Sequence, residues 1–154
     1  MKIAILQMNA GFDPAANAAV LIDAVAKAKA SGAEVLFTPE MSNMLDRNRA
    51  RAAGNIRTED DDGVLSAVRV AAAEAGLWVH LGSLAVRGTG SDDKWRNRGF
   101  VIRPDGAIAA RYDKIHLFDV DLASGESWRA MSAMQSGACA RRWPVFQAPN
   151  WLLR

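Results

Sequence analysis

A glutamate, Glu40, stands at the predicted end of a short buried strand. The apolar run Val35–Phe37 leads into Thr38 and Pro39 directly before it. Valine and phenylalanine favour a pleated, enclosed environment, and a proline cannot donate a further ladder hydrogen bond, so the chain must leave the sheet beside the carboxylate. Functional side chains of open α/β sheets often lie at such strand ends. Glu40 is therefore a candidate for chemistry, and the alternative is an ordinary solvated or helix-capping carboxylate.

A lysine, Lys114, is the second candidate, and it lies in the stretch Tyr112–Asp119, which reads YDKIHLFD. This stretch combines a cation, an imidazole and apolar residues immediately after a predicted strand, an unusual mixture for a solvent-facing loop. The alternatives are a surface ion pair between Lys114 and Asp113, and a structural, hydrogen-bonded role for His116. The residues next to Lys114 in the sequence do not decide between these interpretations.

The N-terminal segment predicts the β-α-β unit that would deliver Glu40. An apolar strand is expected within 2–8, and Asp13 before Pro14 is a favoured pair for an N-cap and first helical residue. The helix should run to about Ala30 and stop at Ser31 and Gly32. A right-handed crossover then makes the two strands parallel. The face expected to be buried consists of Val20, Leu21, Val25 and Ala28.

The middle of the chain predicts a second helix and a third strand. After a polar stretch over 42–62, interpreted as mixed loop and helix, a helix is expected over Val64–Ala75, with Gly76 ending it. Leu65, Val68, Ala72 and Ala75 are spaced to form its buried face. The next strand, Leu77–Val86, contains Gly82, which suggests a bulge or a close backbone approach.

A hairpin is predicted to carry the chain into Lys114. The turn Pro104–Gly106 combines a residue with preset φ and a glycine that accepts positive φ. The flanking segments Phe100–Arg103 and Ile108–Tyr112 then pair as antiparallel strands, with the first strand starting near Asn97. Gly82, Gly88 and Gly90 lack the spacing of a phosphate-binding loop.

Composition limits the class of protein. With 154 residues, half of them hydrophobic, the chain suits one α/β domain with a sizeable core. One cysteine and two histidines exclude an internal disulfide framework and leave no recognisable cluster of metal ligands, so neither a metal nor a cofactor is expected. No segment has the ~20 apolar residues of a membrane span and no extended apolar signal region opens the chain, so a cytoplasmic location is expected.

The net charge of +2 does not indicate a nucleic-acid partner. Three arginines and no acid follow Arg129, which leaves the chain up to that residue at −1. Without a basic stripe interleaved with aromatic residues, the electrostatic pattern of a nucleic-acid-binding protein is missing. Arg47, Arg49 and Arg51 are interpreted as a solvated loop or helix face.

In several places the sequence resembles the nitrilase, or carbon–nitrogen hydrolase, superfamily, in the same order along the chain. The resemblance covers residues 1–129. The residues around His116 are most similar to those of the ω-amidase-like branch of the superfamily. The matching features are the first strand ending in Gln7, the Phe37–Glu40 segment, the Gly82 strand, the Asn97–Gly106 hairpin and, most specifically, Tyr112–Asp119.

The resemblance implies a role for each candidate. It implies that Glu40 is a general base, that Lys114 stabilises an oxyanion, and that a cysteine is the nucleophile in hydrolysis of a small carboxamide. It also implies an α/β/β/α sandwich of which this chain would hold about the first half. Sheets left with exposed apolar faces then lead us to expect a homo-oligomer.

The sequence departs from the family pattern where the nucleophile should be. The resemblance implies a cysteine at the end of an apolar strand, followed by Tyr-Asp, and Cys139 has neither flank. No nucleophile is therefore assigned. The family also has a second, supporting glutamate, and this sequence has Ala130 at the corresponding position. The expectation is a carbon–nitrogen hydrolase that is inactive in this chain, and the alternative is a non-catalytic binding or oligomerisation module.

Residues 130–154 are interpreted as a tail that does not match the family. The tail lacks helical or strand periodicity and contains two of the five tryptophans and the only cysteine. A frameshift or a truncated gene would produce such a run. The alternative is a divergent C-terminal extension that binds a partner, with Trp143–Phe146 as a short docking strand.

Overall fold

The computed structural model describes residues 1–89, 94–115, 119–121 and 127–129. Its centre is a five-stranded sheet in which strand order follows chain order. The first three strands are parallel and the last two pair antiparallel to their neighbours. The strands of this sheet are β1 (Ile3–Ile5), β2 (Val35–Phe37), β3 (Trp78–Arg87), β4 (Trp95–Ile102) and β5 (Ile108–Asp113). A separate antiparallel pair is formed by β6 (Asp119–Asp121) and β7 (Ser127–Arg129).

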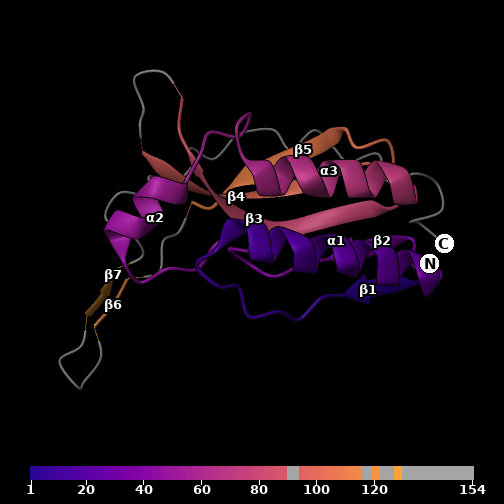
Figure 1. The fold of residues 1–154 in the computed structure, drawn as a ribbon, viewed down its shortest axis with the longest axis horizontal. Helices are drawn as coiled ribbons and strands as arrows, with labels where there is room; N and C mark the ends of the chain where they lie inside the picture. The colour runs from indigo at the N-terminus through magenta and orange to yellow at the C-terminus, as the bar shows by residue number, and fades with distance from the viewer. Residues whose placement is uncertain (90–93, 116–118, 122–126, 130–154) are drawn as a thin grey trace.

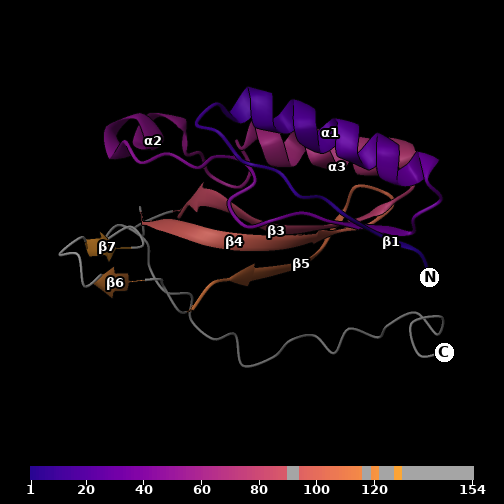
Figure 2. The same cartoon turned by 90° about the horizontal axis from the view of Figure 1, so that it is seen from below.

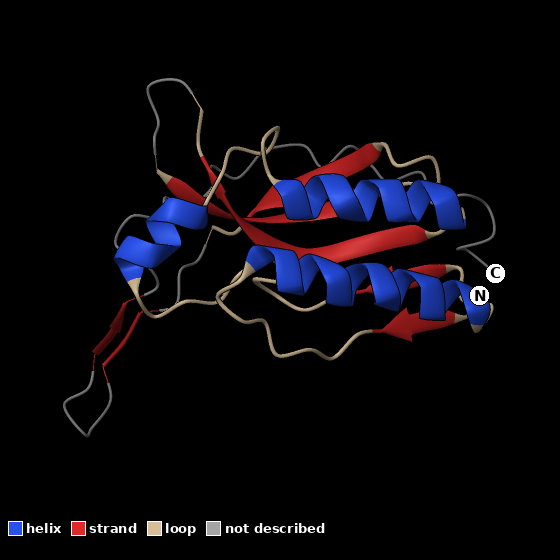
Figure 3. Ribbon diagram, viewed as in Figure 1, coloured by secondary structure: helices blue, strands red, loops and turns tan. Residues whose placement is uncertain are grey.

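Two helices cover one face of the five-stranded sheet, α1 (Pro14–Ala30) and α3 (Gly63–Ala75), as Figures 1 and 2 show. A short helix, α2 (Arg49–Asn55), lies beyond the N-terminal end of α3 (Figures 1 and 3). The predicted caps are confirmed: Asp13 accepts a hydrogen bond from the backbone of Ala15, and α3 ends at Gly76 in the left-handed conformation. No helix of the described part of the chain is long and apolar enough to cross a membrane.

The core lies between these helices and the sheet. Leu21 and Val25 of α1 are buried, as predicted, and Phe100 is the largest fully buried side chain among the described residues. Val20, predicted to face the core, is exposed instead. It stands about 100° around the helix from Leu21, outside the stripe that touches the sheet. On α3 the predicted residues Leu65, Val68 and Ala72 are buried, whereas Ala75 is only partly buried at the edge of the core.

The other face of the sheet carries apolar residues that are open to solvent in the described part of the chain. Ile5 and Phe37 share this face through their register, and Ile5 is 75% exposed. Phe37 stacks on His80 at 5.2 Å between ring centroids. The described residues thus form one helical layer and one sheet layer. The prediction of an α/β fold is confirmed, and the layers follow the order expected for the first half of an α/β/β/α sandwich.

Both features predicted for Gly82, a bulge and a close backbone approach, are present in the structure. The pairing of β3 with β4 shifts register between Leu81 and Leu84, which marks a bulge. A Cβ atom added to Gly82 would collide with the carbonyl groups of Thr38 and Pro39. The segment that leaves β2 therefore crosses β3 in direct backbone contact, and only glycine permits that approach.

Candidate active site

The turn that presents Glu40 is held by hydrogen bonds to β3. The backbone N–H of Met41 donates to the Ser83 hydroxyl at 2.9 Å, and the N–H of Ser42 donates to the Ser83 carbonyl at 2.9 Å. Met41 has φ of 55°, which makes it the one non-glycine residue with positive φ in the described part of the chain. Such a left-handed conformation persists only where the surroundings hold it, and it often accompanies functional sites. These contacts fix the backbone directly after Glu40.

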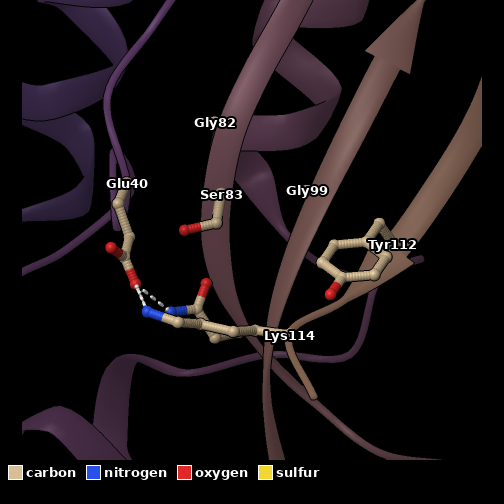
Figure 4. Close-up of a pocket in the computed structure, with 7 residues that line it drawn as sticks. Glu40, Gly82, Ser83, Gly99, Tyr112 and Lys114 are labelled. Atoms are coloured by element: carbon tan, nitrogen blue, oxygen red, sulfur yellow. Dashed lines mark hydrogen bonds and ion pairs between the residues drawn. The ribbon is translucent and has the colours of Figure 1, made fainter. Parts of the chain in front are cut away.

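Lys114 reaches the same place from the end of β5. Its backbone N–H donates to the carbonyl of Asn97 at 2.8 Å, which continues the pairing of β5 with β4. Its ammonium lies 2.8 Å from Oε1 of Glu40, although 74 positions separate the two residues (Figure 4). The two residues to which the resemblance assigns roles in one reaction therefore meet in the structure. The expected strand-end position of Glu40 is confirmed, since β2 ends at Phe37.

A third residue, Asn97, completes the contact. Its side-chain amide donates to the same Glu40 Oε1 at 2.5 Å. Only 7% of Asn97 is exposed, whereas the side chains of Glu40 and Lys114 are 53% and 36% exposed. A buried amide thus supports a partly solvated ion pair.

These residues border one pocket with a volume of about 370 Å³. Its size suits a small ligand. Figure 4 shows Lys114 and the Ser83 hydroxyl beside the Glu40 carboxylate, and the Tyr112 ring across the pocket from it. The residues that line the pocket are Glu40, Gly82, Ser83, Asn97, Gly99, Tyr112 and Lys114.

The site keeps Glu40 charged. The hydrogen bond from Lys114 lowers the pKa of Glu40, partial burial acts against it, and the amide of Asn97 lowers the pKa further. The net direction is downward from the ordinary value, so the carboxylate is ionised at neutral pH. An ionised carboxylate can accept a proton, which a general base must do.

A cluster of ion pairs on the opposite face of β4 and β5 supports the strand end. Arg98 binds both Asp113, the residue before Lys114, and Glu59. Arg111 pairs with Glu59, and Arg96 pairs with Asp113. Because successive residues of a strand point to opposite faces, anchoring Asp113 on one face directs Lys114 to the other.

Sequence reasoning missed four pocket residues, Ser83, Asn97, Gly99 and Tyr112. Asn97 and Gly99 stand two positions apart on a predicted strand and so share one face, which is a signal that was available. His116, Ala130 and Cys139 lie outside the described residues. No group of three or more His, Cys, Asp or Glu side chains that could hold a metal ion occurs among the described residues.

Comparison with known proteins identifies the family. The family model for carbon–nitrogen hydrolases matches residues 2–153, and the chain belongs to this family. The match extends past Arg129, where the sequence predicts a change of domain, and that boundary remains a prediction.

Individual relatives agree with this assignment. The chain is 32% identical over 121 residues to a deaminated glutathione amidase of Yersinia enterocolitica, covering 79% of this chain and 42% of that protein. The NitFhit protein of C. elegans shares the fold, with a TM-score of 0.75 and 23% identity over 88% of this chain and 33% of that one. An amidase mutant from Nesterenkonia sp. AN1 in complex with butyramide gives a TM-score of 0.65 and 27% identity over 77% of this chain and 44% of that one. The chain spans less than half the length of each of these proteins.

Proposed function

We propose that this chain carries the base and the oxyanion-stabilising cation of an amidase-type carbon–nitrogen hydrolase. The contact between Glu40 and Lys114 at 2.8 Å supports the proposal most directly. Glu40 is the general base, and Lys114 is the cation that faces the reacting carbonyl. The depressed pKa of Glu40, caused first by Lys114, keeps the base ionised before substrate arrives.

The reaction needs a cysteine thiol in addition to this pair. Glu40 takes the thiol proton, and the thiolate attacks the amide carbon to form a C–S bond. Lys114 stabilises the negative oxygen of the tetrahedral intermediate. The C–N bond then breaks, and ammonia leaves with the proton held by Glu40. Glu40 then takes a proton from water, and the hydroxide attacks the thioester carbon. The C–S bond breaks, the carboxylic acid leaves, and Glu40 returns the proton to the sulfur, which restores the thiol.

The proposed substrate is a small carboxamide. A pocket of about 370 Å³ suits such a molecule. The related Nesterenkonia amidase was crystallised with butyramide, which has this size and chemistry. Butyramide is therefore the first ligand to test.

We further propose that the chain has no amidase turnover by itself. Its only cysteine, Cys139, lacks the flanks of the family nucleophile. A base and an oxyanion site without a nucleophile leave a small part of the usual acceleration. The second candidate function, a module that binds an amide without hydrolysing it, rests on this same observation.

Two measurements test these proposals. Butyramide binding is followed by NMR shifts of the Tyr112 ring, which lines the same pocket, and ammonia release is assayed on butyramide and ω-amido acids. We expect binding that is lost in Lys114→Ala, with no turnover above background. The Arg103→Ala variant is the control, because Arg103 pairs only with the exposed Asp105 among the described residues. No binding would refute the amide site, and turnover abolished by Cys139→Ala would refute inactivity.

A further inference from the structure

The side chain of Asn97 occupies an unusual position in the site. Its Nδ2 donates to Glu40 Oε1 at 2.5 Å, while its backbone carbonyl accepts the N–H of Lys114 at 2.8 Å. One residue of β4 therefore contacts both members of the ion pair, which come from the ends of β2 and β5. The three residues form a closed set of contacts.

Both donors meet the same carboxylate oxygen. Lys114 Nζ and Asn97 Nδ2 each bind Oε1 of Glu40. Oε2 makes no hydrogen bond to any of the described residues. A carboxylate held in this way cannot exchange its two oxygens by rotation without breaking two hydrogen bonds.

We infer that Asn97 is the positioning residue of this site, which fixes the Glu40 carboxylate so that Oε1 stays with Lys114 and Oε2 remains open to accept a proton. The role of Oε2 rests on the proposed function, whereas the fixing of the carboxylate does not. Asn97 is a positioning residue because it acts through Glu40 on the substrate.

The chemistry of an amide suits this role. A second cation at this place would stabilise the carboxylate strongly and make it a weaker base. A carboxylate at position 97 would repel Glu40. The neutral amide supplies a donor with a smaller effect on basicity. Its 7% exposure means that water competes little for the contact.

The local backbone holds Asn97 in place. It pairs with Ala85 of β3, one residue beyond the bulge that brings the Glu40 turn over the sheet. Two residues on, a Cβ atom at Gly99 would lie 2.9 Å from the Gly82 carbonyl, so β3 and β4 approach closely beneath the pocket. This packing places the Asn97 amide beneath the Glu40 carboxylate.

The test is a titration of the Glu40 carboxyl carbon by ¹³C NMR, assigned with Glu40→Gln. In Asn97→Ala the loss of one donor should raise the midpoint by about one pH unit. Asn97→Asp keeps the size of the side chain and guards against a variant that fails to fold. It should raise the midpoint further, because two adjacent carboxylates resist joint ionisation.

Asn17→Ala is the matched control. Asn17 is also buried, and its amide bonds to the backbone carbonyls of Gly11 and Asn43 instead of Glu40. We expect its Glu40 titration to match that of the parent chain. An unchanged midpoint in both Asn97 variants, or an equal rise in Asn17→Ala, would overturn the inference. The titration uses no substrate, so absent butyramide binding counts against the proposed function alone.

Discussion

Arg98 holds the carboxylate of Asp113 with two hydrogen bonds, from Nε to Oδ1 at 2.5 Å and from Nη2 to Oδ2 at 2.9 Å. The remaining nitrogen of the guanidinium, Nη1, donates to Glu59 at 2.8 Å. A bidentate pair of this kind is specific in geometry as well as favourable in energy. It fixes the end of β5 one residue before Lys114, on the face that does not carry the pocket.

Removal of Arg98 should destabilise the chain. Arg98→Leu removes the bidentate partner of Asp113 and one of the two arginines that pair with Glu59, and both carboxylates are largely buried, so we expect a loss of about 2–4 kcal/mol in the free energy of unfolding. Urea denaturation at pH 7 measures this loss. Arg103→Ala removes an exposed ion pair and should cost less than about 1 kcal/mol. Equal losses in the two variants would contradict the anchoring role.

Acidification should weaken the fold through the same cluster. Burial would raise the pKa of both Glu59 and Asp113. At Glu59, hydrogen bonds from Arg111 and Arg98 outweigh the effect of burial. At Asp113, interactions with Arg98 and Arg96 outweigh it. Both pKa values are lowered, so the folded state binds fewer protons than the unfolded state in the acid range. The stabilisation is complete above about pH 5 and is lost as the pH falls through the folded-state pKa values.

Urea midpoints between pH 7 and pH 3 check this direction. The matched comparison is Arg98→Leu, in which the pH dependence should be weaker because the carboxylates have lost a charged donor. A urea midpoint that rises on acidification in the parent chain would contradict the predicted loss of stability at low pH. A variant curve parallel to the parent curve would show that other carboxylates cause the effect.

Gly82 should tolerate no side chain. In Gly82→Ala the new methyl group would meet the carbonyls of Thr38 and Pro39, and the resulting overpacking should cost about 1–3 kcal/mol. It should also displace the turn that presents Glu40. Gly54→Ala is the control, since a Cβ at Gly54 meets no atom within 4 Å and the residue lies within α2. That change should stabilise the chain by about 0.5–1 kcal/mol. Thermal denaturation of both variants tests the contrast.

The open face of the sheet should make the chain self-associate. Ile5 and Phe37 lie together on this face, and contiguous exposed apolar surface favours association. We expect concentration-dependent sedimentation, binding of a hydrophobic dye and a broad thermal transition. Ile5→Lys should reduce the first two. Leu45→Lys, at another exposed apolar residue, should leave them unchanged. A monomer with a sharp two-state transition would contradict this prediction.

The sequence alone determined the strands of the five-stranded sheet and the two helices that cover it, and it named the two charged residues. Asp13 precedes α1 with the side chain that caps it, and Gly76 ends α3. The turn at Pro104–Gly106 requires a residue with positive φ, which Gly106 supplies at 78°. These features depend on residues within a few positions of one another, so local propensity is enough to predict them. Glu40 and Lys114 were found in the same way, from the motifs around them.

Tertiary structure alone decided how those residues meet. The shared contact of Lys114 and Asn97 with one oxygen of Glu40 joins three strands, and no local pattern specifies it. The left-handed conformation of Met41 depends on Ser83, which lies 42 positions away. The exposure of Val20 likewise depends on where α1 rests on the sheet. Each of these is set by packing between distant segments, where the free energy of burial and hydrogen bonding outweighs the weak preferences of single residues.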